Sequence, residues 1–453
     1  MRLAIALVMT ALLSESPDAA ERGSPPSVRP YNVVLLAVDG LRADHLGLYG
    51  YRRATSPHLD SRAKAAVVFE RAIAPASWTL PSFASMFSGL PPLEHRALSH
   101  RRQFPASKPL LAEALRTAGY RTAAFAGGHF LDPVFGLMRG FDLRRNTGWG
   151  RYDFLRTTAP RGARWIRDHH AQGPFFLFVH GNDVHPPFMQ PESGEATSLA
   201  IDEGRRGGLV DSSLLDYSFV AAFNAGREAK VFFGFVPPND YLQEVSAIKD
   251  DPAEMARVAA HYDSRILAAD HDLETVFQAL AETGREKDTL VVLLSDHGLE
   301  LGERGALATA FHHSLADEII RVPLVLWHPD LPARRVQATV ALEDLPATIL
   351  ELAGLSGRLP GRSFAGLARG KSESEPREAF SVSSVLDFEG TIRLHSIDRG
   401  EWKLVYDQES EQTRLFNIKS DPGETLDVSA REPKITRSLL ERLSRRVGRS
   451  LVD

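Results

Sequence analysis

Continuous apolar runs that end in polar residues constrain the fold of this chain more than any other sequence feature. The runs comprise residues 32–38, 121–126, 175–179 and 289–294, with 322–327 as a fifth candidate. Such runs are typical of parallel strands that are buried on both faces. Helical patterns lie between them at 110–118 and 255–283, the second ending at Gly284. The alternation predicts an α/β fold with a doubly wound, mostly parallel central sheet flanked by helices.

Polar residues stand directly after these strands. A doubly wound sheet binds its ligands in the crevice at the carboxyl ends of its strands, so these residues are expected to lie together. Asp296 and His297 are adjacent metal-ligand types, and the glycine after them permits a tight turn. Taken alone, Asp39 after the first run is explained equally well as a helix cap. The polar residues that follow the strands are Asp39, His180, Asp183, Asp296 and His297.

The length of 453 residues and the 43% hydrophobic content allow one large domain and a smaller one. We predict an α/β domain over residues 28–372, in which residues 190–250 form an insertion or cap facing the substrate. Short strand-like pieces and a terminal helix at 433–447 predict a smaller α+β subdomain over residues 373–453. Ser82 is expected to cap the helix that follows Thr79.

The first 22 residues have the pattern of a secretory signal peptide. Arg2 precedes an apolar run over residues 3–13, and small and polar residues follow as far as Ala20. The run is too short for a stable membrane anchor, so we expect an exported, periplasmic or extracellular protein without an integral anchor. The position of Asp18 does not suit a cut after Ala20. The alternative is an apolar extension that packs locally.

Charge and cysteine content exclude several classes of function. The formal net charge of −5 is distributed along the chain, so neither nucleic acid nor an anionic membrane is an expected partner. The sequence contains no cysteine. Disulfides, thiolate metal sites and a nucleophile made by modifying cysteine are therefore excluded.

Ordered sequence blocks over about residues 31–430 resemble the sulfatase family of the alkaline phosphatase superfamily. The resemblance implies an alkaline phosphatase-like fold and a metal-dependent hydrolase or transferase acting on sulfate or phosphate esters. The blocks are NVVLLAVDGLRADHLGLYGY, TSPHLD, SWTLPSFASMFSGLPP, FLFVHGNDVHPPF, HYDSRILAAD, DTLVVLLSDHG and HHSLADEIIRVPLVLWHP, followed by EDLPATILELAGL, EWKLVY and LFNIKSDPGE.

The resemblance also implies roles for matching residues. In similar proteins a divalent cation is held by acidic residues after the first strand and by a later Asp-Asn or Asp-His pair, which map onto Asp39, Asp296 and His297. The nucleophile motif C/S-x-P-S-x reads TLPSF here, so Thr79 occupies the position of the nucleophile and joins the metal ligands.

Histidines are implied as contacts for the ester oxygens. The HxxDxHxP block supplies His185, with His180 nearby, and the segment before RVP supplies His312, with His313 as a neighbouring candidate. His185 or His312 can stabilise charge on the non-bridging oxygens or protonate the leaving oxygen. Arg42 matches a family position from which an arginine either binds the ester or pairs with Asp39; both readings stay open.

Three departures from the family pattern concern the reaction itself. Gly40 replaces the second acidic residue after the first strand, Thr79 replaces the cysteine or serine that becomes formylglycine, and Phe83 replaces an arginine. Threonine cannot form the aldehyde, but a metal-bound threonine alkoxide is a strong nucleophile. With one carboxylate fewer and one imidazole, the set Asp39, Thr79, Asp296 and His297 favours manganese or zinc over calcium or magnesium.

Two functions from different classes follow. The first is a metal-dependent hydrolase or transferase in which Thr79 attacks a sulfate or phosphate ester of a small molecule, glycan or lipid head group. Water or another alcohol then releases the covalent ester, a step that favours phosphorus. The second is a sulfatase-like protein without catalysis that binds a glycan or lipid head group, favoured by Gly40 and the missing arginine.

Overall fold

The computed structural model describes residues 31–99, 102–146, 154–185, 251–304, 307–309, 314–384 and 391–451. The signal peptide expected at 1–22 and the insertion expected at 190–250 lie outside the described residues. Within the described ranges, no helix is both long enough and apolar enough to cross a membrane.

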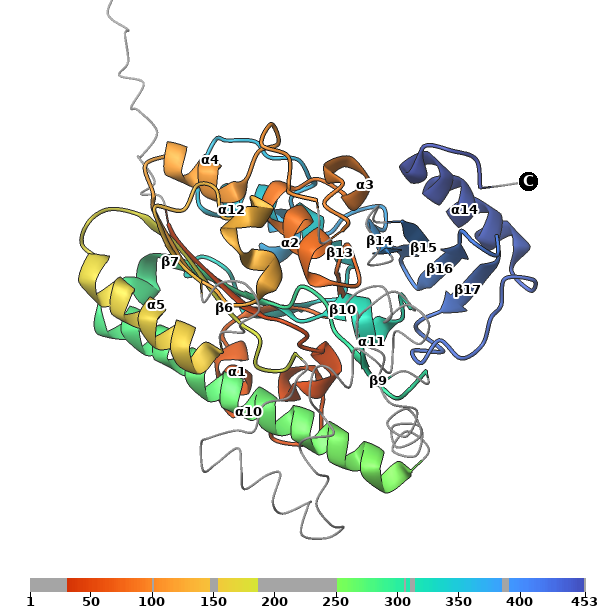
Figure 1. The fold of residues 1–453 in the computed structure, drawn as a ribbon, viewed down its shortest axis with the longest axis horizontal. Coiled ribbons are helices and arrows are strands. Elements are labelled where there is room, and N and C mark those ends of the chain that lie inside the picture. Colours follow the sequence, from red (N-terminus) through yellow and green to blue (C-terminus); the bar gives the residue numbers. More distant parts are fainter. Residues whose placement is uncertain are drawn as a thin grey trace, which may run out of the picture.

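The described residues form an eight-stranded main sheet, which Figure 1 shows from its side. Its strands pair in parallel except where β11 joins its two neighbours. In spatial order they are β12 (Arg334–Val336), β2 (Val67–Phe69), β11 (Leu324–Trp327), β7 (Thr289–Leu294), β1 (Asn32–Val38), β6 (Phe175–Gly181), β4 (Arg121–Phe125) and β5 (Leu143–Arg145).

The central position of β1 determines where the polar residues meet. β1 lies between β6 and β7 and is parallel to both, so the carboxyl ends of all three strands share one edge. The expected fifth parallel strand at 322–327 is wrong in direction, because β11 runs antiparallel to β7. The residues before it form β10 (Arg321–Val322), in a separate small sheet with β3 (Ala72–Ile73) and β13 (Val340–Ala341).

Helices cover both faces of the sheet (Figure 1). The β1 side chains alternate between two apolar clusters: Val33, Leu35 and Ala37 join α2, α4 and α12, whereas Val34, Leu36 and Val38 join α5 and α10. The helices are α1 (Pro57–Ala63), α2 (Thr79–Ser88), α3 (Pro92–His95), α4 (Leu111–Thr117), α5 (Leu155–His169), α10 (Pro252–Glu282), α11 (Asp317–Ile320), α12 (Leu345–Leu352) and α13 (Ala365–Ala368).

A C-terminal subdomain completes the fold. It has a four-stranded antiparallel sheet packed against one helix, drawn in blue in Figure 1. Its elements are β14 (Glu378–Ser384), β15 (Ile392–Arg399), β16 (Trp402–Asp407), β17 (Thr413–Asn417) and α14 (Pro433–Val447). The fold class predicted from the sequence, a mostly parallel α/β sheet with a smaller α+β part, is confirmed.

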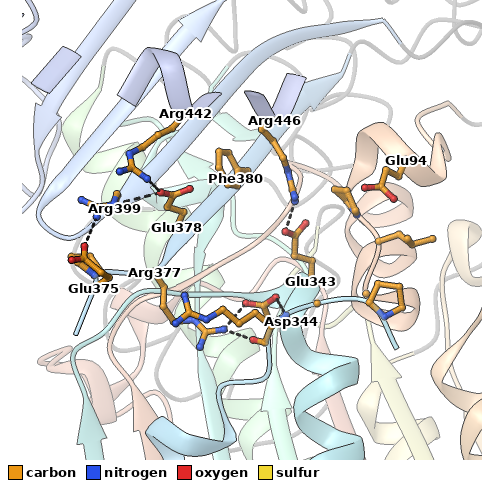
Figure 2. A pocket seen from close by; sticks show the side chains of 17 residues that line it. Glu94, Glu343, Asp344, Glu375, Arg377, Glu378, Phe380, Arg399, Arg442 and Arg446 are labelled. Carbon is orange, nitrogen blue, oxygen red and sulfur yellow. Dashed lines mark hydrogen bonds and ion pairs between the residues drawn. The ribbon is translucent and has the colours of Figure 1, made fainter. Parts of the chain in front are cut away.

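A cavity of about 700 Å³ lies between this subdomain and the part of the α/β domain around the end of α2 and the start of α12. Figure 2 shows arginines and carboxylates facing one another across it. Arg377 pairs with Asp344 at 3.0 Å, and Arg446 pairs with Glu343. These two pairs join the subdomain to the segment before α12. Gly89, which lines the cavity, directly follows the last residue of α2. Thr79 is the first residue of this ten-residue helix, so it lies about 15 Å from the cavity along the helix.

Candidate active site

Asp39 is buried in the turn that directly follows β1. Its backbone N–H donates to the carbonyl of Gly181 at 3.0 Å, which continues the pairing with β6. Gly40 then takes a φ of +78°, a conformation that glycine adopts without strain. The Tyr262 hydroxyl of α10 donates to the Gly40 carbonyl at 2.8 Å and accepts from the Arg42 N–H at 2.9 Å. The turn that presents Asp39 is therefore held on both sides.

Asp296 and His297 lie in the turn after β7, beside Asp39. The Ser295 hydroxyl donates to the His297 carbonyl at 2.6 Å and fixes this turn. His297 Nδ1 donates to the Gly298 carbonyl at 2.8 Å, so Nε2 is the nitrogen that faces the site. Nε2 lies 3.2 Å from Asp39 Oδ1 and 3.4 Å from Asp296 Oδ2. The turn thus brings one imidazole between two buried carboxylates.

Thr79 is the first residue of α2, and its side chain points to the same place. Its hydroxyl lies 3.4 Å from Asp39 Oδ2 and 3.3 Å from His297 Nε2. The expectation that Ser82 caps this helix is wrong: its hydroxyl donates to the Asp296 carbonyl at 2.6 Å. That contact ties the first turn of α2 to the turn that carries Asp296, and so keeps Thr79 close to the carboxylates.

The end of β6 contributes further side chains. His180 is fully buried, with Nε2 3.7 Å from Asp39 Oδ2 and the Phe83 ring edge-on to it at 5.3 Å. The Asn182 amide donates to Asp39 Oδ2 at 2.8 Å, a contact that the sequence does not predict. The His185 N–H donates to the Asn182 carbonyl at 3.2 Å, so the turn returns His185 to the site. Only the position of Asn182 after a strand could have drawn attention to it.

Asp39, Asp296 and His297 shift one another's pKa values. Burial opposes ionisation of Asp39, but His185, His180 and His297 outweigh it and hold the pKa of Asp39 well below its usual value. Burial and the Asp39 charge raise the pKa of Asp296 to about 6. Burial lowers the pKa of His297, yet the Asp296 and Asp39 carboxylates outweigh this effect and raise it to about 9. At neutral pH two ionised carboxylates and one protonated imidazole therefore share this point.

The residues at this site fit a divalent cation. Asp39, His185 and His297 each offer one ligand atom, and these atoms lie within 4.8 Å of one another. Among the described contacts, both Asp296 carboxylate oxygens and Asp39 Oδ1 are buried without a hydrogen-bond donor. Buried charges need a paired charge or a metal, and this donor set of carboxylates and imidazoles is one that divalent metals accept. The Thr79 hydroxyl faces the same centre.

The structure thus brings together most of the residues expected at the site, namely Asp39, Thr79, His180, His185, Asp296 and His297. Arg42 lies apart from them. Its buried guanidinium pairs with Asp44 at 2.7 Å and with Glu303 at 2.6 Å rather than with Asp39. His312 and His313 lie outside the described residues.

Comparisons with known proteins agree with this arrangement. The family model described as Sulfatase matches residues 31–355. Arylsulfatase K of Rattus norvegicus is 22% identical over 478 residues, covering 96% of this chain and 81% of the relative. Choline-sulfatase of Rhizobium meliloti (strain 1021) is 26% identical over 418 residues, covering 83% and 77%. The crystal structure of phosphonate monoester hydrolase of Agrobacterium radiobacter superposes with a TM-score of 0.68 at 20% identity, covering 92% of this chain and 95% of the other.

The expected enzyme class, an ester hydrolase acting on sulfate or phosphate esters, is supported by these relatives. The family match extends over well more than half of the sequence, from the residue before β1 to the end of the α12 region. The chain therefore belongs to the sulfatase family.

Proposed function

We propose that this chain is a metal-dependent ester hydrolase in which Thr79 is the nucleophile that attacks a sulfate or phosphate monoester. The observation that carries the proposal is the position of the Thr79 hydroxyl, 3.4 Å from Asp39 Oδ2 and 3.3 Å from His297 Nε2. A hydroxyl in contact with a cluster of metal-ligand types is placed as an activated nucleophile requires.

Asp39, Asp296, His297 and the Thr79 oxygen would hold the ion in this proposal. A bound divalent cation would lower the pKa of the threonine hydroxyl and offset the negative charge of the approaching ester. Manganese and zinc suit this mixture of carboxylate and imidazole better than calcium does.

The first turn of α2 binds the ester oxygens in this proposal. No described side chain caps this ten-residue helix at its start, so its first N–H groups and its positive dipole end favour an anion next to Thr79. His185 and His180 supply further donors from the end of β6. Donors fixed before the substrate arrives stabilise charge that develops on the non-bridging oxygens.

The proposed reaction has two steps, formation of a covalent ester on Thr79 and its hydrolysis. Thr79 Oγ bonds to sulfur or phosphorus as the bond to the ester's alcohol oxygen breaks, and that oxygen takes a proton from His185 or His312. Asp39 Oδ2 and His297 Nε2, which face the Thr79 hydroxyl, would both be ligands of the cation, so the departing proton passes to water. Water then attacks the central atom of the threonine ester, which releases sulfate or phosphate and restores the hydroxyl. Phosphorus accepts this second attack readily, so phosphate monoesters are the favoured substrates.

The substrate is a monoester of a small molecule, a glycan or a lipid head group. Choline-sulfatase and arylsulfatase K, by their names, act on such sulfate esters. An alcohol in place of water would make the same enzyme a transferase. Export through a signal peptide over residues 1–22 would bring it to substrates outside the cytoplasm.

The test compares wild type with Thr79→Ala on 4-nitrophenyl sulfate and 4-nitrophenyl phosphate in the presence of Mn²⁺. We expect Thr79→Ala to lose at least about a hundredfold in kcat, because the covalent step is removed. Intact-mass analysis of quenched wild type, followed by peptide mapping, should locate an added phosphate or sulfate on Thr79. Equal activity of the two proteins would refute the proposal and favour a binding protein without catalysis.

A further inference from the structure

The segment that leads into Thr79 is held by a strand of the C-terminal subdomain. Ala76 pairs in parallel with Val382 of β14. The Ser77 N–H donates to the Val382 carbonyl at 3.2 Å, and the Val382 N–H donates to the Pro75 carbonyl at 3.1 Å. The Ser381 hydroxyl adds a bond to the backbone just before this segment, at 2.7 Å. Residues about 300 positions downstream therefore fix the backbone that precedes the nucleophile.

Trp78 extends this anchoring to the residue next to Thr79. Its side chain is fully buried, and its indole N–H donates to the Ser384 hydroxyl at 2.8 Å. The Phe130 ring packs edge-on against it at 5.1 Å. Ser384 in turn contacts the Leu98 carbonyl at 3.4 Å; because a carbonyl can only accept, the serine hydroxyl donates there and presents a lone pair to the indole.

Trp78 is also the residue from which α2 begins. Its backbone is extended, with φ −160° and ψ 167°, and Thr79 is the first helical residue. Trp78 makes no side-chain cap, so the contact of its indole with Ser384, together with the backbone bonds of Pro75 and Ser77 to Val382, fixes the direction in which the helix starts. A shift of the indole would carry Thr79 away from Asp39 and His297.

We propose that Trp78 and Ser384 are positioning residues for the reaction, and that the C-terminal subdomain thereby completes the active site. The inference rests on the proposed role of Thr79 as nucleophile. The pair does not touch the ester; it holds the Thr79 hydroxyl at its distance from the metal ligands. Reaction rates are sensitive to such placement, since an error of about 1 Å in a reacting group can cost about a hundredfold.

The experiment uses the full chain with Mn²⁺ and four variants. Trp78→Phe retains an aromatic ring beside Phe130 but removes the indole N–H, and Ser384→Ala removes its acceptor. Ser384→Thr keeps a hydroxyl. Trp327→Phe is the matched control, because that indole also donates a single hydrogen bond, to the Arg62 carbonyl at 2.9 Å, away from the carboxyl edge of the sheet.

The variants that break the contact between Trp78 and Ser384 should turn over more slowly but bind Mn²⁺ as tightly as wild type. We expect Trp78→Phe and Ser384→Ala each to lower kcat about tenfold on 4-nitrophenyl phosphate, with the Kd for Mn²⁺ within about twofold of wild type by calorimetry. The double variant should be no slower than the slower single variant, since both remove one interaction. Ser384→Thr should recover most of kcat, and Trp327→Phe should not change it. Circular dichroism confirms that every variant is folded at the assay temperature.

Three results would overturn the inference. One is a kcat within about twofold of wild type in both single variants; another is a double variant whose losses multiply. A third is a loss of Mn²⁺ affinity equal to the loss of kcat, which would mean general disturbance of the site. Each of these counts against the inference alone if Thr79→Ala has lost activity. If Thr79→Ala is as active as wild type, the proposed function fails and this inference fails with it.

Discussion

At the scale of single residues, His297 has a protonation state that a metal ion must change. Two neighbouring carboxylates favour its charged form, so at neutral pH its Nε2 carries a proton when no ion is bound. A cation needs the lone pair of that same nitrogen. The Asp296 carboxyl, with a pKa of about 6, must also be ionised to serve as a ligand.

We therefore expect Mn²⁺ binding at pH 7 to release close to one proton, and the apparent affinity to rise about tenfold per pH unit from pH 7 towards pH 9. Below pH 6 the affinity should fall more steeply, because Asp296 must lose a proton as well. Titration calorimetry at pH 7 in two buffers of different ionisation enthalpy gives the number of protons released. An affinity that is constant between pH 7 and pH 9 would contradict this account.

At the scale of elements, the turn between β1 and η1 (Ala43–His45) explains why a glycine follows Asp39. Gly40 has a φ of +78°, and a Cβ placed on it would meet Leu299 Cδ2 at 3.3 Å and the Cα of His185 at 3.6 Å. The position that holds an acidic residue in similar proteins is therefore one where this chain tolerates a side chain poorly. Gly119, after α4, also has a positive φ of +88°, but its Cβ would meet open space.

Alanine substitutions at these two glycines distinguish the effect of backbone strain, which both share, from the effect of Cβ contacts, which only Gly40 has. Gly40→Ala and Gly119→Ala should each lose about 1–2 kcal/mol of unfolding free energy, because alanine is strained at positive φ. Only Gly40→Ala should lower kcat, since Gly40 directly follows Asp39 and its Cβ would press on Leu299 Cδ2 at 3.3 Å, whereas a Cβ on Gly119 meets nothing. Urea denaturation and steady-state kinetics measure the two effects. Equal kcat values for the two variants would show that the turn does not control the site.

The elements that the sequence predicts well are those whose burial is uniform. β1 and β7 match the apolar runs 32–38 and 289–294, and their polar ends do meet. The direction of β11 could not be predicted, because an apolar run reports burial and not the neighbour with which it pairs. Contacts such as Asn182 to Asp39 and Ser82 to the Asp296 carbonyl could not be predicted either. A short polar side chain chooses its partner from the tertiary structure, here 143 and 214 positions away.

At the scale of the whole molecule, a buried lysine links the C-terminal subdomain to a short helix, and that helix contacts the turn that carries His297. Lys403 of β16 is fully buried and donates to Glu424 at 2.6 Å and to Asp317 of α11 at 3.0 Å. The Gly298 N–H, next to His297, donates to the Ile319 carbonyl of the same short helix at 2.6 Å. The docking of the subdomain is therefore connected to the turn that carries the metal ligands.

The charge at Lys403 compensates two carboxylates, so its removal should be costly and dependent on pH. We expect Lys403→Met to lose about 3–5 kcal/mol of unfolding free energy at pH 8, because it leaves the buried Glu424 carboxylate without its nearest cation, whereas Asp317 keeps Arg71. Burial raises the pKa of Glu424 to about 7 from 4.5, although Lys403 opposes this shift. Stability from the neutral Glu424 is complete below pH 4.5 and is lost as the pH rises through 7. Without Lys403 the ionised form is still less favourable, so the variant should lose more at pH 8 than at pH 6.

Urea denaturation of wild type and Lys403→Met at pH 6 and pH 8 measures both quantities. Adding Glu424→Gln to the variant should recover part of the stability and remove most of the added pH dependence, since the glutamine cannot ionise. Lys419→Met is the matched control, because Lys419 is exposed and its loss should change stability by less than about 0.5 kcal/mol. A loss in Lys403→Met that is equal at pH 6 and pH 8 would show that Glu424 is not the group whose ionisation Lys403 compensates. The contact between the subdomain and α11 would then depend on Asp317, which Arg71 also binds at 2.5 Å.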